Sequence, residues 1–350
     1  MTRSVHRQAD ERRTAAEKGI VVAAPSGRDA GTVPAVTRGA TLPKLPPCLI
    51  GMEACGTAHY WGRKLESFGH TVRLMAPQRV KPYLAGEKND ANDAAAICEA
   101  VGRPCMRFVP LKSAEQQALL VLHRTRAGLV QARTAASNQV RGLLLEFGIT
   151  LKVGRREVLA KLPGILEEAE NGLPPVAREG LAIVFEHLKD LQQRIVQSEH
   201  AIRTWHRHDE ASQRLAAIPG VGLLSATAWV ASAGDAKVFK NGRQFAAWLG
   251  LVPRQHSSGG HTRLSGISKR GDRYLRTLLI QGAHSVLRHR ARGEAPWLDQ
   301  LMERRHRNVV AVALANKNAR RAWVLLAEHR AYQSDYVSSR PGLRALPANL

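Results

Sequence analysis

Short apolar runs alternate with amphipathic stretches from residue 42 onward. PCLIGMEACG ends its apolar run at Glu53 and leads through a glycine-containing turn into AHYWGRKLESFG, which predicts a strand and then a helix. HTVRLMAP predicts a second strand, which Pro77 ends, and MRFVPL predicts a further one. The amphipathic stretch KNDANDAAAICEAVG lies between these two and predicts another helix. This strand–helix–strand order is typical of an α/β sheet.

Two long amphipathic segments follow. Residues 113–147 start with a capping box, Ser113 and Gln116, and carry apolar residues at helical spacing. A segment of near-heptad apolar spacing at 175–213 predicts a helical hairpin or short coiled coil with the first. The pattern leaves open whether the helices pack within one chain or form a dimer seam. The basic residues on the other faces of the first helix, which are candidate nucleic-acid contacts, are Arg124, Arg126, Arg133 and Arg141.

The last third of the chain combines apolar helical runs with glycine-containing turns. LAAIPGVGLLSATAWVASAG places Gly220 and Gly222 between two such runs. In a helix–hairpin–helix, such a turn lets backbone N–H groups and a helix N-terminus approach a phosphate. A simple tight turn explains the same residues. Beyond it, HSSGGHTRLSGISKRG predicts a flexible Gly- and Ser-rich loop that leads into a basic helix, and a final helix is expected near 308–331.

The first 41 residues differ in kind from the rest of the chain. They contain no leucine and no aromatic residue, and only GIVVAA could form a strand. Such a stretch has little to bury, so we expect it to be poorly ordered. The whole pattern predicts the following organisation: an atypical segment 1–41, an α/β domain 42–148, a helical or coiled-coil linker 149–213, a mainly helical domain 214–331 and a polar tail 332–350.

The net charge of the chain indicates which class of partner it binds. The formal net charge is +23 and the isoelectric point about 10.8, which suits a polyanion such as nucleic acid. No apolar run reaches the ~18 residues that a membrane-spanning helix needs, and the N-terminus lacks a signal-peptide core. We therefore expect a cytoplasmic protein that binds nucleic acid and no membrane.

Three acids could form a metal site. Glu53 ends a predicted strand, and the carboxyl edge of an open α/β sheet is the usual place for a site. Asp90 and Asp93 lie three residues apart, on one side of a predicted helix. A hard cation such as Mg²⁺ or Mn²⁺ would remove the repulsion between converging carboxylates and could assist phosphoryl transfer. Alternatively, the aspartates favour the helix N-terminus through its dipole, and Glu53 accepts backbone donors.

A serine in the basic loop is a candidate nucleophile. Ser257 and Ser258 precede two glycines, and a serine that attacks a phosphodiester needs cations around the transition state. The cationic residues close to them in sequence are Arg254, His256, Arg263, Lys269 and Arg270, with Arg273 and Arg276 in the helix that follows.

Several of these motifs together resemble one family. PPCLIGMEACG, VRLMAPQRVKPY, KNDANDAAAICEA and the long C-terminal motif from IPGVG through GRQFAAWLGLVPRQHSSGG to GISKRGDRYLRTLLI are similar to the DEDD transposases of bacterial insertion sequences, the IS110 family and its IS1111 group. The resemblance spans about residues 42–330. It implies an RNase H-like (RuvC-like) domain whose four acids bind Mg²⁺, a coiled-coil region, and a mainly α transposase domain whose serine becomes joined to DNA.

The resemblance also implies partners and residue roles. Relatives assemble as dimers and tetramers on a structured bridge RNA that selects the DNA, so we expect double-stranded DNA, a guide RNA, other copies of the chain and the bacterial nucleoid as its surroundings. The second acid of the set falls on Glu53 and the last two on Asp90 and Asp93. The serine nucleophile falls on Ser258, with Ser257 as the alternative.

The first acid of the set has no counterpart. The family places it in a strand of the type GIDxAK, whereas the corresponding window here is MTRSVHRQADERR. Asp10 and Asp29 are the nearby aspartates, and neither follows a suitable apolar run, so residues 1–41 could be a misassigned start. Three hypotheses follow: a serine-dependent transposase, a nuclease that uses metal-assisted hydrolysis alone, and a catalytically degenerate remnant that binds nucleic acid.

Overall fold

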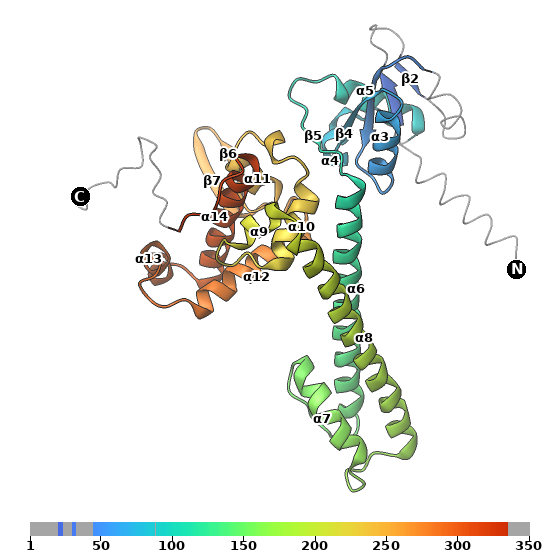
Figure 1. Ribbon diagram of the computed structural model, residues 1–350, viewed down its shortest axis with the longest axis vertical. Helices are drawn as coiled ribbons and strands as arrows, with labels where there is room; N and C mark the ends of the chain where they lie inside the picture. The colour runs from blue at the N-terminus through green and yellow to red at the C-terminus, as the bar shows by residue number, and fades with distance from the viewer. Residues whose placement is uncertain (1–19, 24–29, 33–44, 88, 335–350) are drawn as a thin grey trace, which may run out of the picture. The chain divides into compact units, whose positions relative to one another are not determined.

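The computed structural model describes residues 20–23, 30–32, 45–87 and 89–334 (Figure 1). The side chains of Asp90, Arg155 and the segments 20–23 and 30–32 lie outside this description. The chain divides into two compact units. The first comprises residues 1–117 with 232–235, and the second comprises residues 118–231 with 236–350.

The first unit is built on a sheet with the strand order β2-β1-β3-β4-β5. Its strands are β1 (Ile20–Ala23), β2 (Ala30–Thr32), β3 (Leu49–Glu53), β4 (Thr71–Met75) and β5 (Phe108–Val109). β3 and β4 are parallel, with Glu53 opposite Met75, whereas the other neighbours pair antiparallel. The strands predicted from PCLIGMEACG, HTVRLMAP and MRFVPL are therefore confirmed.

Helices cover both faces of β3. Ile50 and Met52 pack in a core with Leu65 of α3 (Ala58–Glu66), the helix predicted between β3 and β4. Gly51 faces the opposite side, where α5 (Asp90–Val101) crosses so closely that a Cβ would lie 3.1 Å from Ile97. The glycine thus lets α5 approach the backbone of β3. The short helices α4 (Pro77–Val80) and η3 (Lys81–Tyr83) lie between β4 and α5 in the chain.

The segment 1–41 contains more regular structure than expected. β1 and β2 form an antiparallel pair, and β1 supplies the partner of β3 on the side away from β4. An unpaired edge on β3 would leave its backbone N–H and C=O groups without partners, so even a short strand is stabilised there. The rest of this segment lies outside the described residues, as does the tail from residue 335.

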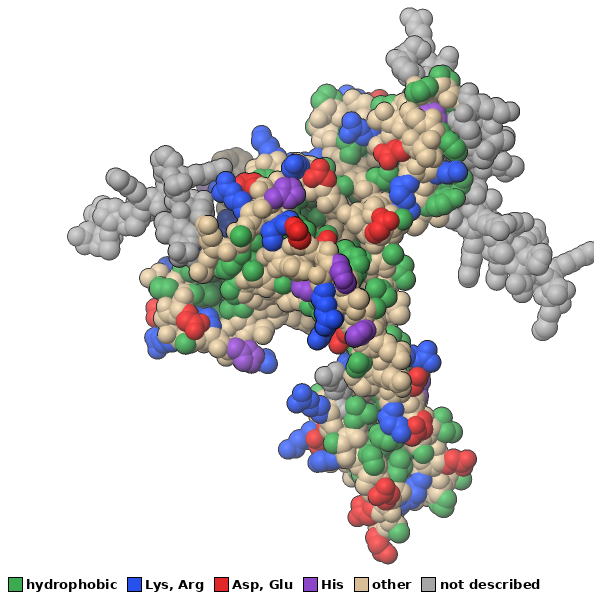
Figure 2. Space-filling model, in the orientation of Figure 1, with side chains coloured by type: hydrophobic (Ala, Val, Ile, Leu, Met, Phe, Trp, Pro, Cys, Tyr) green, Lys and Arg blue, Asp and Glu red, His purple; other side chains and the backbone are tan. Residues whose placement is uncertain are grey.

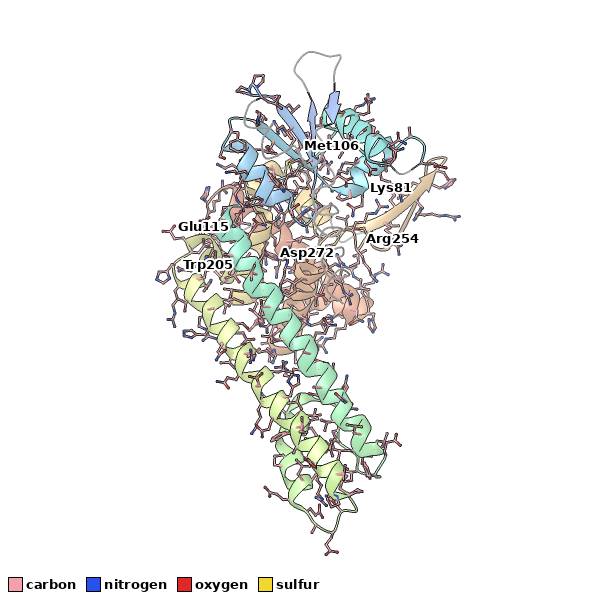
Figure 3. All side chains as sticks on the ribbon, turned by 90° about the vertical axis from the view of Figure 1, so that its right-hand side faces the viewer. Lys81, Met106, Glu115, Trp205, Arg254 and Asp272 are labelled. Carbon is pink, nitrogen blue, oxygen red and sulfur yellow. The ribbon has the colours of Figure 1, made fainter. Side chains whose placement is uncertain are left out.

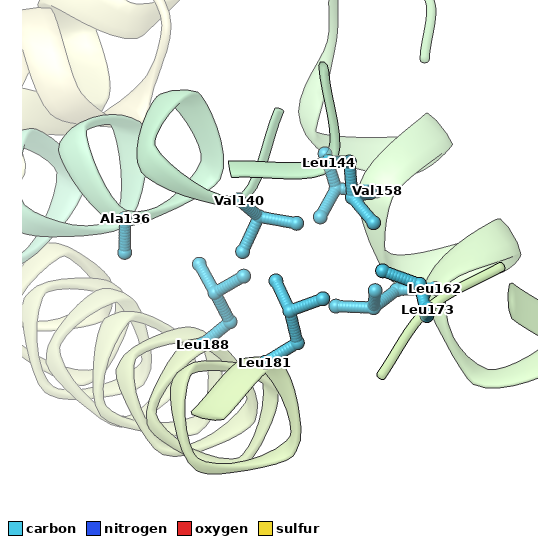
Figure 4. Packing of buried hydrophobic residues seen from close by; sticks show 8 residues of the cluster. All are labelled: Ala136, Val140, Leu144, Val158, Leu162, Leu173, Leu181 and Leu188. Atoms are coloured by element: carbon cyan, nitrogen blue, oxygen red, sulfur yellow. The ribbon is translucent and has the colours of Figure 1, made fainter. Parts of the chain in front are cut away.

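A long helical arm, residues 118–207, begins the second unit. It contains most of α6 (Ala114–Leu145), then α7 (Arg155–Glu167) and α8 (Pro175–Arg207). Arg126 pairs with Glu199 at 2.7 Å and Arg133 donates to Gln192 at 2.7 Å, so α6 and α8 run antiparallel. Leucine, valine and alanine side chains of the three helices, together with Leu173 from the α7–α8 turn, form a core at the end of the arm that carries α7 (Figure 4). The helices predicted at 113–147 and 175–213 thus pack against each other within one chain, although the second ends at Arg207 and a separate helix begins at Glu210.

Both ends of the arm helices are held by specific hydrogen bonds. At the start of α6, Ser113 and Gln116 exchange the two bonds of the predicted capping box, at 3.0 and 3.1 Å. Near the α7–α8 turn, the Arg178 guanidinium donates to the carbonyl oxygens of Ile165, Leu166 and Glu168. These carbonyls belong to the last turn of α7 and the residue after it, where helical partners are missing.

The rest of the second unit is mainly helical. Its elements are α9 (Glu210–Ala216), α10 (Leu223–Ala233), η4 (Ala236–Val238), α11 (Gly242–Trp248), α12 (Arg273–His289), α13 (Pro296–Arg304) and α14 (Arg307–Ala327). The faces of α12 and α14 that carry Leu279, Ala283, Leu314 and Ala315 are buried. In the described part of the chain, no helix is long and apolar enough to cross a membrane.

A β-hairpin replaces the flexible loop expected around the serines. β6 (Pro253–Ser258) and β7 (His261–Ile267) pair antiparallel, joined by Gly259 and Gly260 alone. Both glycines have positive φ, 55° and 79°, as a type I′ turn requires. The expectation of a loop was wrong because the two glycines permit this tight turn, and strand pairing then satisfies the flanking backbone.

Candidate active site

Glu53 projects from the end of β3 on the face that α5 covers. Side chains alternate along a strand, and Gly51 faces Ile97 and Val101 of α5. Glu53, two residues further on, therefore points to the same side. The residue is partly buried at the carboxyl end of the parallel pair β3 and β4. The prediction that Glu53 ends a strand is confirmed, whereas its role as a metal ligand stays a prediction.

Asp93 lies on the helix stripe that faces β3. It precedes Ile97 by four residues and Val101 by eight, so the three side chains share one face of α5. The helix begins with its own cap, because the Asn89 side chain accepts a hydrogen bond of 2.7 Å from the N–H of Asn92. No aspartate is therefore needed to cap α5.

The acids described have the chemistry that a hard divalent cation prefers. Carboxylate oxygens from Glu53 and Asp93 come from facing elements, the end of β3 and the first turns of α5. Among the side chains that the structure describes, no three His, Cys, Asp or Glu residues gather as a metal-binding group. The side chain of Asp90 is outside those residues, and so are Asp10 and Asp29, the possible replacements for the first acid. The ligand set of three acids stays a prediction.

The hairpin register separates the two candidate serines. Ser258 lies opposite His261, and His256 lies opposite Arg263. Opposed residues share a face, and so do residues two apart on one strand. Ser258, His256, His261 and Arg263 therefore form one face, which we call the serine face. All residues from 253 to 266 are exposed.

Ser257 belongs to the other face of the hairpin. It lies opposite Thr262, on the side of Gln255 and Leu264, and its Oγ accepts a hydrogen bond of 2.9 Å from Gln255 Nε2. This face carries no cationic side chain to assist attack on a phosphate. His261 was not among the site residues predicted from the sequence. A two-residue turn at Gly259 and Gly260 would have predicted that His261 lies opposite Ser258.

More basic residues follow the hairpin. Arg254 is the second residue of β6, and Asp272 caps α12 (Figure 3), accepting from the N–H groups of Tyr274 and Leu275. Lys269, Arg270 and Arg273 are exposed around this helix start. The Arg276 guanidinium instead donates to the carbonyl oxygens of Leu249 and Gly271, so it joins α12 to the end of α11.

The four arginines predicted as contacts on α6 differ in their surroundings. Arg124 is exposed, and Arg141 is half-buried and donates to Asn138 at 3.2 Å. Arg126 and the buried Arg133 are engaged with α8, as described above. Figure 2 shows Lys and Arg side chains along the arm and Asp and Glu side chains toward its lower end. Glu167, Glu168 and Glu170, at and after the end of α7, are exposed.

The Gly220–Gly222 turn joins α9 to α10 and lines a shallow groove of about 580 Å³, together with Gln281, Gly282 and Ser285 of α12. Gly220 has φ +84°, and a Cβ there would lie 2.9 Å from the Gly282 carbonyl oxygen. Packing against α12 therefore explains Gly220. Nothing lies within 4 Å of a Cβ on Gly222, which leaves a role in phosphate contact as a prediction.

A buried polar network joins the arm to α10 and α12. Thr227 Oγ1 donates to the Leu223 carbonyl oxygen at 2.7 Å and so accepts from His123 Nε2, 3.0 Å away. His123 Nδ1 then accepts from the Tyr274 hydroxyl, also at 3.0 Å. Burial, with a smaller effect of the nearby Arg126 charge, lowers the pKa of His123 to about 4, and burial raises the pKa of Tyr274.

Known proteins match both units. The family model described as "Transposase IS116/IS110/IS902 family" matches residues 212–298, and a second transposase model, of the DEDD type found in IS110, matches residues 34–149. A "Probable family 20 transposase" of Pseudomonas aeruginosa is 55% identical over 294 residues, which are 83% of this chain and 87% of that relative. The chain belongs to the IS110 family of DEDD transposases.

Two further relatives place the chain within this family. The transposase for insertion sequence element IS1111A of Coxiella burnetii is 44% identical over 82% of this chain and 79% of its own length. The transposase for IS1328 of Yersinia enterocolitica is 43% identical over 81% and 85%. The family resemblance expected from the motifs is confirmed. The chain thus carries a RuvC-like DEDD domain, a type that uses divalent metal ions, and belongs to a family of transposases that recombine DNA.

Proposed function

We propose that this transposase cleaves and rejoins DNA strands through Ser258, with Glu53, Asp90 and Asp93 as ligands of Mg²⁺ or Mn²⁺. The observation that carries the proposal is the serine face: an exposed serine at a tight turn, beside cationic side chains. Ser258 Oγ would attack a phosphodiester, giving a phosphoserine link to DNA that a second strand then resolves. Arg263 and the neighbouring Arg254 would stabilise the charge of the transition state. A bound divalent metal would further neutralise the phosphate.

The charge of the second unit supports a nucleic-acid substrate. Residues 236–330 contain nineteen Lys and Arg against five Asp and Glu. Lys269, Arg270 and Arg273 would bind phosphates beside the hairpin, and we propose the same for Arg124 on the arm. In this proposal, a structured bridge RNA selects the DNA, and a dimer or tetramer near the nucleoid carries out the exchange.

The test is a covalent protein–DNA species. Purified protein is incubated with duplex DNA carrying the element ends, RNA transcribed from the DNA that flanks the coding region, and Mg²⁺. We expect a complex that resists SDS, that disappears with EDTA and in Ser258→Ala, and that survives in the matched variant Ser257→Ala. If DNA is cut equally well by Ser258→Ala, without a linked species, the chain is a metal-dependent nuclease instead.

One observation favours the alternative, a degenerate remnant. The strand beside β3, on the side away from β4, is the antiparallel β1, Ile20–Ala23, which contains no acid. A chain without the first metal ligand would bind DNA, with the steep salt dependence of phosphate contacts, yet leave it uncut at every Mg²⁺ concentration.

A further inference from the structure

We propose that His261 is the proton acceptor that activates Ser258. The inference rests on the proposed function, since it concerns the same serine. It assigns a catalytic role to His261, which is neither a proposed metal ligand nor one of the Arg and Lys residues proposed to bind phosphate. The structure supports it through the pairing of the hairpin.

The register places His261 directly across from Ser258. The two residues flank the Gly259–Gly260 turn and are Cα partners in the β6–β7 ladder. Directly opposed residues have Cβ atoms ~4.5–5.5 Å apart and project to the same face. From that separation a ring nitrogen of His261 can reach Ser258 Oγ by side-chain rotation alone. The tight turn fixes this pairing, because a slip by one residue would send the two side chains to opposite faces.

The other groups on the serine face suit different tasks. His256 precedes Ser258 by two residues on the same strand, about 7 Å along it, and lies opposite Arg263 instead. Arg263 is diagonal to Ser258, ~7–8 Å away at the backbone and within reach of a long side chain. Its guanidinium is always charged, so it can hold a phosphate oxygen but cannot accept a proton. His261 is thus the group placed to take the proton.

His261 and solvent exchange the protons in the proposed reaction. The Ser258 Oγ–H proton moves to a ring nitrogen of His261 as the new Oγ–P bond forms. The P–O bond to the departing strand breaks, and its oxygen leaves as a hydroxyl after taking a proton from solvent. When the hydroxyl of the second strand attacks the phosphoserine, its proton passes to solvent, the Oγ–P bond breaks, and Ser258 Oγ takes back the proton from His261. Histidine is suited to both directions because it changes charge between about pH 5 and 8.

The experiment compares the rate of the covalent species in the parent, His261→Gln and His256→Gln from pH 6 to pH 9. The substrate, flanking RNA and Mg²⁺ are those of the Ser258 test. Removal of a general base slows a step by roughly 100-fold or more, and hydroxide compensates as the pH rises. We therefore expect His261→Gln to be at least about 100-fold slower at pH 7, with the deficit shrinking toward pH 9. His256→Gln should lose less and follow the pH profile of the parent.

Two outcomes would overturn the inference. One is a His261→Gln rate close to that of the parent at every pH. The other is an equal, pH-independent loss in both histidine variants, which would indicate DNA contact alone. Ser258→Ala in the same series distinguishes the two proposals: if it still forms the covalent species, the proposed function fails, and if it alone abolishes the species, only the role of His261 fails. Unchanged thermal unfolding of His261→Gln, which lies on an exposed hairpin, serves as the folding control.

Discussion

Single residues in the second unit explain its tightest packing. Gly220 and Gly282 bring the α9–α10 turn and α12 together backbone to backbone, and a Cβ on Gly282 would collide with the Gly220 carbonyl oxygen. Backbone cannot yield as a flexible side chain can. A side chain at this position therefore has to separate α12 from the turn, which disturbs the core around both.

We expect Gly282→Ala to lower the melting temperature by several degrees, since overpacking costs ~1–3 kcal/mol. The matched control is Gly180→Ala in α8, where nothing lies within 4 Å of the added Cβ. Alanine is the better helix former by about 0.5–1 kcal/mol, so this variant should melt at or above the parent temperature. Equal effects of the two variants in thermal unfolding would argue against the close contact.

His123 makes stability depend on pH. Its pKa is about 4 in the folded chain, whereas an unfolded histidine titrates near 6.5. The unfolded state therefore binds the proton more readily, and the stability that neutral His123 contributes is fully present above about pH 6.5 and lost as the pH falls toward 4. Between pH 7 and pH 4.5 this loss is about 2–3 kcal/mol.

The pH dependence is tested with His123→Gln, which cannot titrate in this range. The variant should be less stable than the parent at pH 7, because the bonds to Thr227 and Tyr274 are altered. Its stability should fall less steeply between pH 7 and pH 4.5. Parallel curves for parent and variant in urea unfolding would contradict a buried neutral histidine.

Among elements, the arm depends on how the end of α7 is held. Arg178 of α8 donates to three carbonyl oxygens at that end and to Asn171 Oδ1. Arg194, also on α8, makes an exposed pair with Asp190 in the same helix. Because Arg178 also donates to the Leu173 carbonyl oxygen, four backbone groups lose a charged donor in the first case and none in the second.

We expect Arg178→Ala to destabilise the end of the arm by about 2 kcal/mol and to expose residues 165–173 to protease. Arg194→Ala should change stability by less than about 0.5 kcal/mol, because an exposed helix pair contributes little. Limited proteolysis of both variants, with the cut sites located by mass spectrometry, makes the comparison. Identical digestion patterns would show that α7 is held by its apolar core alone.

Sequence periodicity predicted the long helices and the strands β3, β4 and β5, but it missed α7 and the β6–β7 hairpin. The helices from Ala114 and Pro175 followed directly from apolar spacing and a capping box. The helix α7 contains Pro163, a residue that usually ends or kinks a helix, so its pattern did not stand out. The β6–β7 hairpin is exposed on every strand residue through Gly266, so no alternation of apolar and polar residues marks its strands. Only its glycine pair carried a signal.

At the scale of the whole molecule, the family motifs predicted more of the candidate site than the pattern of apolar and polar residues did. Asp93 and Glu53 could be assigned to facing elements only because Gly51 places α5 on β3, a packing detail that periodicity does not contain. The motif around Ser258 indicated its chemistry, whereas the register that separates Ser258 from Ser257 required the structure. Neither the family motifs nor the apolar and polar pattern identified a residue for the first acid of the DEDD set.

The central claim is that Ser258 becomes joined to DNA. The most direct measurement is to trap the covalent species, digest the DNA with nuclease and the protein with protease, and locate the nucleotide-bearing residue by mass spectrometry. We expect one adduct, on Ser258, in a peptide that also contains Ser257. An adduct on any other residue, or cleaved DNA with no adduct at all, would contradict it.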